Sequence, residues 1–267
     1  MMKKITVIGG DERLKVVEKE LAASNYAVDT LGLYENDCGS IEDSIAVVFP
    51  VPTTKDKKTV YTPLTHRRIL LSDIAEKLSR NQLVLCCNYR FENLNCIDYG
   101  ALDSYSLLNA VPTAEGAIKL AIENTPYTLW QSRVLVVGYG RVGKILADRL
   151  KAMGCKVTVS ARKPADFALL DALGFNSVNT GNLNFGNLDY DIIFNTVDVK
   201  VISDTALKNS GSSLLIDLSS KGGFSIDAAT DAGIKAIKAP GLPGIVAPQT
   251  AGNILSKTIT ELINSYN

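Results

Sequence analysis

The chain has 267 residues, enough for one large or two modest hydrophobic cores. Its 28 basic and 28 acidic residues give a formal net charge of zero and are spread along the sequence, which argues against a nucleic-acid or anionic-membrane surface. No apolar run approaches the length of a bilayer span, and the five cysteines lack metal-ligand spacing, which fits reduced thiols in the cytosol.

The first half of the chain alternates between expected strands and helices. Residues 5–8 form a first strand rather than a signal peptide, because their apolar run is short and leads directly into charged residues. This alternation predicts a parallel, doubly wound sheet. The further expected strands are residues 26–31, 45–49 and 83–87, and the expected helices are one with an apolar face from Leu14 to Leu21 and one over 64–78.

The residues after the first strand are candidates to face a substrate. Ligands of open α/β sheets collect at the carboxyl ends of strands, where Gly9, Gly10, Asp11 and Arg13 lie, together with residues 52–54. The alternative is that Asp11 only caps its helix and Arg13 is solvated.

A helix is expected to bridge the two halves of the chain. Pro112 and Thr113 suit a helix start, and Pro126 ends the segment. Thr113 and Glu115 would then lie at the N-terminal end of this helix, near a cleft between domains, as candidate substrate-binding residues.

Residues 133–163 carry the strongest pattern, a βαβ unit with a glycine-rich turn. A buried strand over 134–137 precedes the turn, Gly154 is placed to end the helix, and 156–160 is the next strand. In a dinucleotide-binding turn the glycines allow a tight turn, close approach to a pyrophosphate, and packing of helix on strand. The predicted cofactor-binding residues here are Gly138, Tyr139, Gly140, Arg141, Val142 and Gly143.

The end of the second strand favours NADP over NAD. An NAD site usually has a carboxylate there for the ribose 2′-hydroxyl, whereas this chain has Ser160, Arg162 and Lys163, which can donate to a 2′-phosphate. The alternative is that the two cations are solvated and only open the helix after Pro164.

The remaining elements complete a second α/β domain. Strands are expected over 191–195, 214–218 and 234–236, then a rigid loop over 240–248 and a last helix over 249–265. Because the second sheet is complete before this helix, the helix is expected to cross back to the first domain. We therefore predict two Rossmann-like domains with a cleft between them, formed by residues 1–125 with 247–267 and by residues 126–246.

The strand ends of the second domain offer further binding groups. Asn195 and Thr196 stand where such domains contact the nicotinamide ribose, and Ser220 and Lys221 could hold a substrate carboxylate. A 2-hydroxyacid dehydrogenase needs a histidine general acid/base near the late Pro-rich loop, and the only histidine, His66, lies in the first domain. Simple alcohol oxidation is therefore disfavoured, and no catalytic residue or metal ligand is assigned.

The assembled segments resemble the A-subunit family of dipicolinate synthase over nearly the whole chain. The block from Ala239 to Gly252 is long and unusual, while the glycine turn is shared by many dehydrogenases. Other segments that carry the resemblance are residues 7–13, 111–116, 138–143, 161–162 and 217–221.

The resemblance implies NADP-linked oxidation, with dehydration, of 4-hydroxy-tetrahydrodipicolinate to dipicolinate. It further implies a partner, the flavoprotein-like B subunit of dipicolinate synthase, and a location in the mother-cell cytoplasm of a spore-forming bacterium, and we also expect a homo-oligomer. Arg13 and Lys221 are the expected contacts of the two substrate carboxylates. In one departure, Lys221 replaces a family arginine, and lysine cannot make the bidentate contact of a guanidinium.

Two alternatives stay open. One is a 2-hydroxyacid or amino-acid type dehydrogenase, which would turn over simple substrates without a partner. The other is a non-catalytic dinucleotide-binding scaffold that organises a second subunit.

Overall fold

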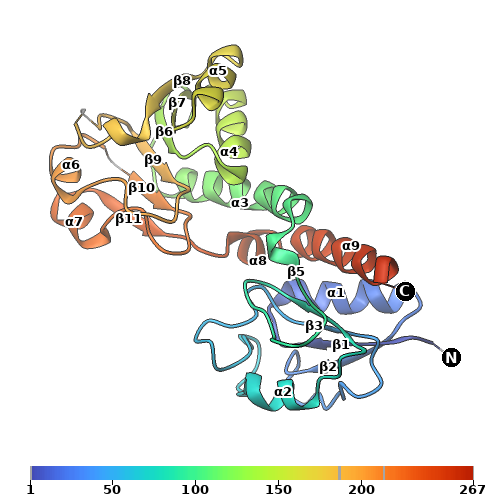
Figure 1. The fold of residues 1–267 in the computed structure, drawn as a ribbon. Coiled ribbons are helices and arrows are strands. Elements are labelled where there is room, and N and C mark those ends of the chain that lie inside the picture. The colour runs from blue at the N-terminus through green and yellow to red at the C-terminus, as the bar shows by residue number, and fades with distance from the viewer. Residues whose placement is uncertain (1, 186–187, 213, 267) are drawn as a thin grey trace. The chain divides into compact units, whose positions relative to one another are not determined.

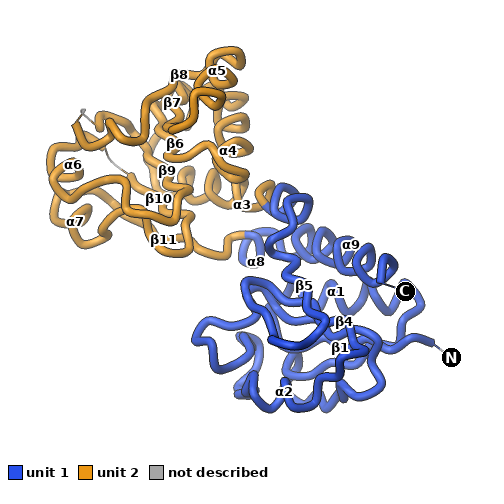
Figure 2. The backbone as a smooth tube through the Cα atoms, in the orientation of Figure 1, with its two compact units in different colours: residues 1–109, 243–267 blue, residues 110–242 orange. Residues whose placement is uncertain are grey.

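A computed structural model describes residues 2–185, 188–212 and 214–266. The chain forms two compact units, unit 1 from Met1–Asn109 and Pro243–Asn267 and unit 2 from Ala110–Leu242 (Figure 2). The first boundary between the units falls inside a helix. The predicted domain boundaries at 125/126 and 246/247 stay a prediction. No helix among the described residues is long and apolar enough to cross a membrane.

Unit 1 contains a parallel sheet in the order β2-β1-β3-β4-β5 (Figure 1). In this order the chain reverses direction across the sheet between β1 and β3, and ligands of such sheets bind at the carboxyl ends of those strands. The strands are β1 (Lys4–Ile8), β2 (Ala27–Leu31), β3 (Ala46–Val48), β4 (Leu83–Cys86) and β5 (Cys96–Asp98). The helices are α1 (Glu12–Ala23), α2 (Leu71–Lys77), η1 (Tyr99–Ala101), the first part of α3 (Asp103–Glu123), α8 (Leu242–Val246) and α9 (Pro248–Tyr266).

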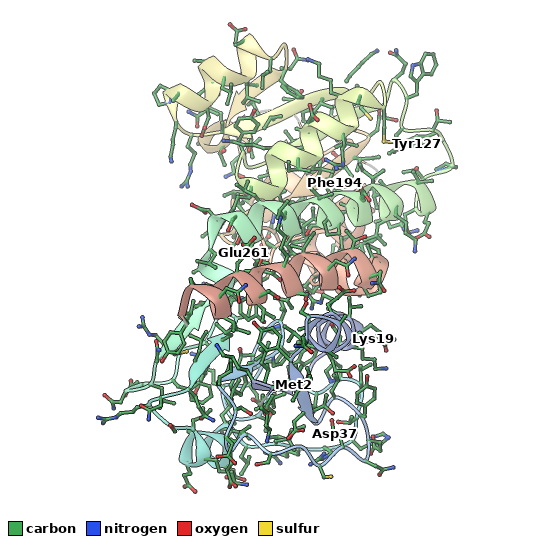
Figure 3. All side chains as sticks on the ribbon, turned by 90° about the vertical axis from the view of Figure 1, so that its right-hand side faces the viewer. Met2, Lys19, Asp37, Tyr127, Phe194 and Glu261 are labelled. Atoms are coloured by element: carbon green, nitrogen blue, oxygen red, sulfur yellow. The ribbon has the colours of Figure 1, made fainter. Side chains whose placement is uncertain are left out.

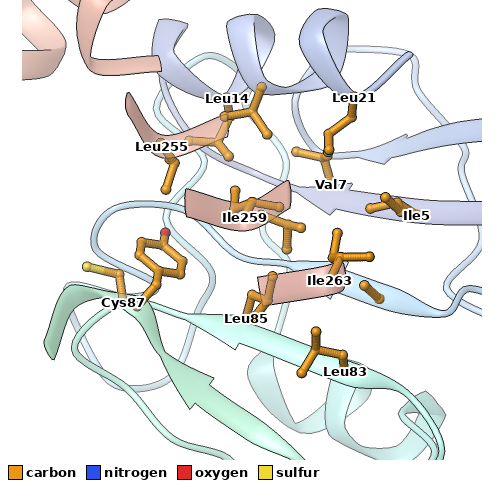
Figure 4. Packing of buried hydrophobic residues seen from close by; sticks show 14 of the residues in the cluster. Ile5, Val7, Leu14, Leu21, Leu83, Leu85, Cys87, Leu255, Ile259 and Ile263 are labelled. Carbon is orange, nitrogen blue, oxygen red and sulfur yellow. The ribbon is translucent and has the colours of Figure 1, made fainter. Parts of the chain in front are cut away.

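Alternate residues of each strand face opposite sides of this sheet, as a two-residue period requires. One side packs against α1 and α9, and the other packs against α2. Leu255, Ile259 and Ile263 of α9 point into the first of these cores, among residues of β1, β4 and α1 (Figure 4). The predicted crossing of the last helix to the first half of the chain is therefore confirmed.

A glycine sets the approach of α9 to α1. A Cβ atom on Gly252 would lie 2.5 Å from Val16 Cβ and 2.9 Å from the Arg13 carbonyl oxygen. We expect Gly252→Ala to lower the free energy of unfolding by about 1–3 kcal/mol, the usual cost of overpacking. Lys257→Ala, an exposed position on the same helix, should change it by less than about 0.5 kcal/mol. Urea unfolding of both variants tests this, and equal stability of the two would contradict it.

Unit 2 contains a parallel sheet in the order β8-β7-β6-β9-β10-β11. Counted from β6 this is the 3-2-1-4-5-6 order of dinucleotide-binding folds, with the crevice between β6 and β9. Figure 3 shows the side chains, with Phe194 of β9 in the interior. The strands are β6 (Arg133–Val137), β7 (Lys156–Ala161), β8 (Asn176–Asn179), β9 (Ile192–Asn195), β10 (Leu214–Asp217) and β11 (Lys235–Lys238). The helices are the rest of α3, α4 (Arg141–Ala152), α5 (Pro164–Ala172), η2 (Thr180–Asn182), α6 (Asp204–Lys208) and α7 (Ile226–Asp231).

Three expected elements are corrected. The bridging helix starts at Asp103 rather than at Pro112, because a proline inside a helix removes one hydrogen bond without having to end the helix. The helix expected over 64–78 begins only at Leu71, after a bridge between Thr59 and Leu70. The loop expected over 240–248 contains the short helix α8.

Candidate functional site

The turn between β6 and α4 needs glycine at two positions for steric reasons. Gly138 has a φ of +99°, and a Cβ atom there would lie 2.7 Å from Thr196 Oγ1. A Cβ atom on Gly143 would lie 2.1 Å from the Gly138 carbonyl oxygen. These contacts are the tight turn and the close helix-to-strand packing of a dinucleotide-binding unit.

The middle glycine of the turn, Gly140, faces open space. No heavy atom lies within 4 Å of the position that a Cβ atom on Gly140 would take. Gly140 is also the N-cap of α4 and has no side chain to bond the first N–H groups of that helix, which include those of Arg141 and Val142. A pyrophosphate would fit here, close to the backbone and at the positive end of the helix.

A pocket of about 250 Å³ extends from this turn to the end of β7. Arg162 and Lys163 line it, both side chains are exposed, and no described carboxylate forms an ion pair with either. Asp166, in the first turn of α5, also lines the pocket, so the pocket contains a carboxylate that the sequence pattern did not reveal. Tyr139 stands at the glycine turn, and burial followed by the charges of Asp166 and Asp148 raises its pKa.

Ser160 does not have the predicted role in binding a 2′-phosphate through its hydroxyl group. Its side chain is fully buried, and its Oγ accepts hydrogen bonds from Gly138 N at 3.1 Å and Thr180 Oγ1 at 3.1 Å. Ser160 therefore holds the glycine turn against the neighbouring strand end.

Asn195, the last residue of β9, and Thr196, which follows it, both use their side chains in hydrogen bonds within the protein. Thr196 lies behind the glycine turn, where its N and Oγ1 both donate to the Val137 carbonyl oxygen. Asn195 is fully buried, and its Nδ2 donates to Asp217 Oδ1 at 2.8 Å and to the Val197 carbonyl oxygen at 2.9 Å. The prediction that Asn195 contacts the cofactor is corrected, because its amide group is already used to join two strand ends.

Two aspartates shape the loop after β10. Buried Asp217 accepts from Ser219 N, Ser219 Oγ and Gly223 N, while exposed Asp198 accepts from Ser220 N at 2.8 Å and Ser220 Oγ at 3.0 Å. The expected role of Ser220 in holding a carboxylate is therefore corrected, since its hydroxyl group binds Asp198. The side chain of Lys221 is exposed and forms no ion pair with a described carboxylate.

In unit 1 the predicted substrate contact Arg13 is buried rather than solvated. Its side chain is 4% exposed, with Nε 2.9 Å from Asp11 Oδ1 and Nη2 2.7 Å from Asp11 Oδ2 and 2.8 Å from the Val51 carbonyl oxygen. Asp11 also caps α1, as the alternative interpretation held. Burial opposes the charge of Arg13, but the hydrogen bonds and charge of Asp11 outweigh it, and the pKa of Arg13 is raised.

Thr113 and Glu115 were expected at the N-terminal end of a helix, but both lie well inside α3. Glu115 Oε1 is 3.5 Å from Nη2 of Arg149, in the last turn of α4. At 1.5 Å per residue that arginine is about 12 Å along the helix from Arg141, where the pyrophosphate would bind. Glu115 therefore lies away from the glycine turn and its substrate role stays a prediction, while Thr113 is a half-buried residue in the middle of the helix.

Asp166 and Asp198 were missed by the sequence analysis, and only Asp166 has a local signal in the sequence. Asp166 follows Pro164 at the start of α5, and an acidic residue in the first turn after such a proline is a common helix signal. Asp198 had no such signal, because its contact with Ser220 joins loops that follow two different strands.

Comparisons with known proteins agree with this geometry. Residues 4–97 match the family described as the N-terminal domain of the dipicolinate synthase A subunit. Residues 113–184 match the NAD binding domain of D-isomer specific 2-hydroxyacid dehydrogenases. The dipicolinate synthase A subunit of Bacillus subtilis is 33% identical, over 97% of this chain and 95% of that protein.

Two solved structures have the same fold. The dipicolinate synthase A subunit from Bacillus halodurans is 29% identical, with 98% of this chain and 97% of that chain covered and a TM-score of 0.88. The crystal structure of the dipicolinate synthase A chain from Bacillus subtilis also shows 29% sequence identity. It covers 100% of this chain and 97% of that chain, with a TM-score of 0.88. The predicted fold of two Rossmann-like parallel sheets and the resemblance are both confirmed. The chain belongs to the dipicolinate synthase A-subunit family of NAD(P)-dependent oxidoreductases.

Proposed function

We propose that the chain catalyses NADP-linked oxidation, with dehydration, of 4-hydroxy-tetrahydrodipicolinate to dipicolinate. When bound, the nicotinamide supplies the hydride acceptor, while the substrate loses one water molecule and one proton as its ring becomes aromatic. The observation that carries the proposal is the open space next to Gly140, which borders a pocket that Arg162 and Lys163 also line.

The chain's own residues would bind and orient the reactants. The first N–H groups of α4 would hold the pyrophosphate, and Arg162 with Lys163 would hold the 2′-phosphate. Lys221 and Arg13 remain our proposed contacts for the two substrate carboxylates. His66 is exposed, in the segment before α2, which fits a reaction driven by aromatisation rather than by a histidine base.

Replacing Arg162 tests the choice of cofactor. Arg162→Ala removes a charge-assisted contact that is typically worth about 1.5–3 kcal/mol, so we expect the Kd for NADP to rise by tenfold or more. The Kd for NAD, which lacks the 2′-phosphate, should stay within about twofold in the same variant. Fluorescence titration of each dinucleotide with the purified variant measures both constants.

Replacing Asp166 is a control that should affect NADP binding in the opposite direction to Arg162→Ala. A carboxylate near a 2′-phosphate is repulsive, so Asp166→Asn should preserve or tighten NADP binding. If NAD were the cofactor, Asp166 would instead accept from the ribose 2′-hydroxyl. Weaker NAD binding in Asp166→Asn, with no loss of NADP binding in Arg162→Ala, would rule out the NADP assignment.

We also propose the setting of this reaction. The family name implies a second subunit, and we propose that this subunit is the flavoprotein-like B subunit. We also propose that the chain forms a homo-oligomer and that it acts in the cytoplasm of the mother cell of a spore-forming bacterium. Size-exclusion chromatography with light scattering, with and without the B subunit, would test both associations.

The activity itself is tested by following the dipicolinate absorbance band. The purified chain is mixed with NADP and freshly made substrate, with and without the B subunit. Dipicolinate formed together with NADPH supports the proposal. Turnover of simple 2-hydroxyacids instead would indicate a general dehydrogenase. Binding of NADP with no hydride transfer, even with substrate and the B subunit present, would indicate a scaffold.

A further inference from the structure

A buried hydroxyl group in unit 1 has no partner. Tyr105, in α3, is 3% exposed, and its Oη forms no hydrogen bond with any described residue. Most buried polar groups in proteins are hydrogen-bonded, since each unpaired one is costly. Such a group therefore calls for an explanation, and a bound water molecule or a ligand would supply one.

The neighbouring tyrosine is satisfied. The rings of Tyr99 and Tyr105 pack edge to face with centroids 5.5 Å apart, and both are buried. Tyr99 Oη donates to the Phe49 carbonyl oxygen at 2.8 Å. The two tyrosines thus share one environment and differ in whether the hydroxyl group is bonded.

A second unused donor lies near Tyr105. The hydrogen bonds of Arg13 use Nε and Nη2, and Nη1 donates to no described atom. Arg13 bonds the carbonyl of Val51, two residues from the Phe49 carbonyl that Tyr99 bonds, and the charge of Arg13 acts on the neighbouring Tyr105. Arg13 follows β1 and its partner Val51 follows β3, so the guanidinium lies at the reversal point where ligands of this sheet type bind.

We propose that the Tyr105 hydroxyl group and Nη1 of Arg13 together bind one carboxylate of the substrate, with Tyr105 as a substrate-binding residue. The inference rests on the proposed function, which requires a dicarboxylate. Burial, followed by the nearby Cys87, raises the pKa of Tyr105 against the opposing effect of Arg13. The hydroxyl group therefore stays protonated at neutral pH, as a donor to an anion must.

Because Tyr105 is buried, a carboxylate can reach its hydroxyl group only after a local movement of the residues around it. Helix α8 lies against the neighbouring ion pair, because a Cβ atom on its Gly244 would lie 2.6 Å from Asp11 Oδ2 and 2.9 Å from Arg13 Nε. This contact also gives a physical reason for the unusual block of residues 239–252, whose glycine allows α8 to lie against the ion pair.

Matched tyrosine variants test the proposal, with dipicolinate as the binding probe. Tyr105→Phe should raise the Kd for dipicolinate and the KM for substrate by about tenfold or more, as expected for a hydrogen bond to a charged group. Its Tm should be unchanged or higher, because the substitution removes an unpaired polar group from the interior. Tyr99→Phe should lower the Tm, because it leaves the Phe49 carbonyl oxygen unpaired, and should keep the wild-type Kd and KM.

The outcomes separate this inference from the proposed function. Wild-type chain that neither binds dipicolinate nor oxidises the substrate would reject the proposed function. Active wild type with unchanged Kd and KM in Tyr105→Phe would reject only the role of Tyr105. A parallel loss of Tm and affinity in Tyr105→Phe would also reject that role, because the hydroxyl group would then be structural.

Discussion

Gly143→Ala is expected to weaken dinucleotide binding strongly and to destabilise unit 2. The added Cβ atom would lie 2.1 Å from the Gly138 carbonyl oxygen and 3.3 Å from Thr196 Oγ1, so the glycine turn has to move. Overpacking of this kind usually costs about 1–3 kcal/mol of stability. Displacing even two of the N–H donors to the pyrophosphate would weaken NADP binding by roughly a hundredfold or more, since each is worth about 1.5–3 kcal/mol. Calorimetric titration with NADP and urea unfolding measure the two effects.

Gly140→Val separates binding from folding. A Cβ atom at Gly140 would meet no heavy atom within 4 Å, so the variant should lose at most about 1 kcal/mol, through the poorer helix cap, while blocking the approach of the pyrophosphate. Loss of NADP binding in both variants, with the larger loss of stability in Gly143→Ala, is the expected pattern. Undiminished NADP affinity in Gly140→Val would mean that the cofactor does not bind over this turn.

Prediction from the sequence was most accurate where all the signals of a structural unit lie in one continuous segment. The βαβ unit over residues 133–163 has its strand, glycines and helix in one continuous stretch, and the structure has all of them in place. Short strands without an apolar run were missed, because β5 and β8 are recognisable only from the neighbours with which they pair. The start of α3 was missed because Pro112 resembles a helix start, although it lies within the helix.

The sequence indicates where the candidate site residues lie along the chain, but it does not show whether their side chains are already bonded to other parts of the protein. Ser160, Asn195 and Ser220 stand at strand ends as expected, yet each side chain already has a protein partner. Those partners are Thr180 with Gly138, Asp217 and Asp198, which belong to other segments of the chain, so no local pattern reveals them. Tyr105 was missed for the converse reason, since only a three-dimensional structure shows that its hydroxyl group is buried and unpaired.

Asp217→Ala is expected to destabilise unit 2 through the loop that follows β10. Asp217 is 1% exposed and accepts hydrogen bonds from Asn195 Nδ2 at 2.8 Å, Ser219 Oγ at 2.6 Å, Ser219 N at 3.0 Å and Gly223 N at 3.3 Å. A hydrogen bond to a charged group is worth about 1.5–3 kcal/mol, so losing several should cost at least about 3 kcal/mol. Urea unfolding followed by the far-ultraviolet circular dichroism signal measures the loss.

Asp198→Ala is the matched control, because Asp198 also accepts from a serine N–H and hydroxyl group in the same loop but is exposed. Water can replace its hydrogen bonds, so the free energy of unfolding should change by less than about 0.5 kcal/mol. Equal losses in the two variants would contradict the argument from burial. If Asp217→Ala alone is destabilising, Asp217 supports the fold beneath the site, and Lys221 is presented from a loop whose position the buried carboxylate sets.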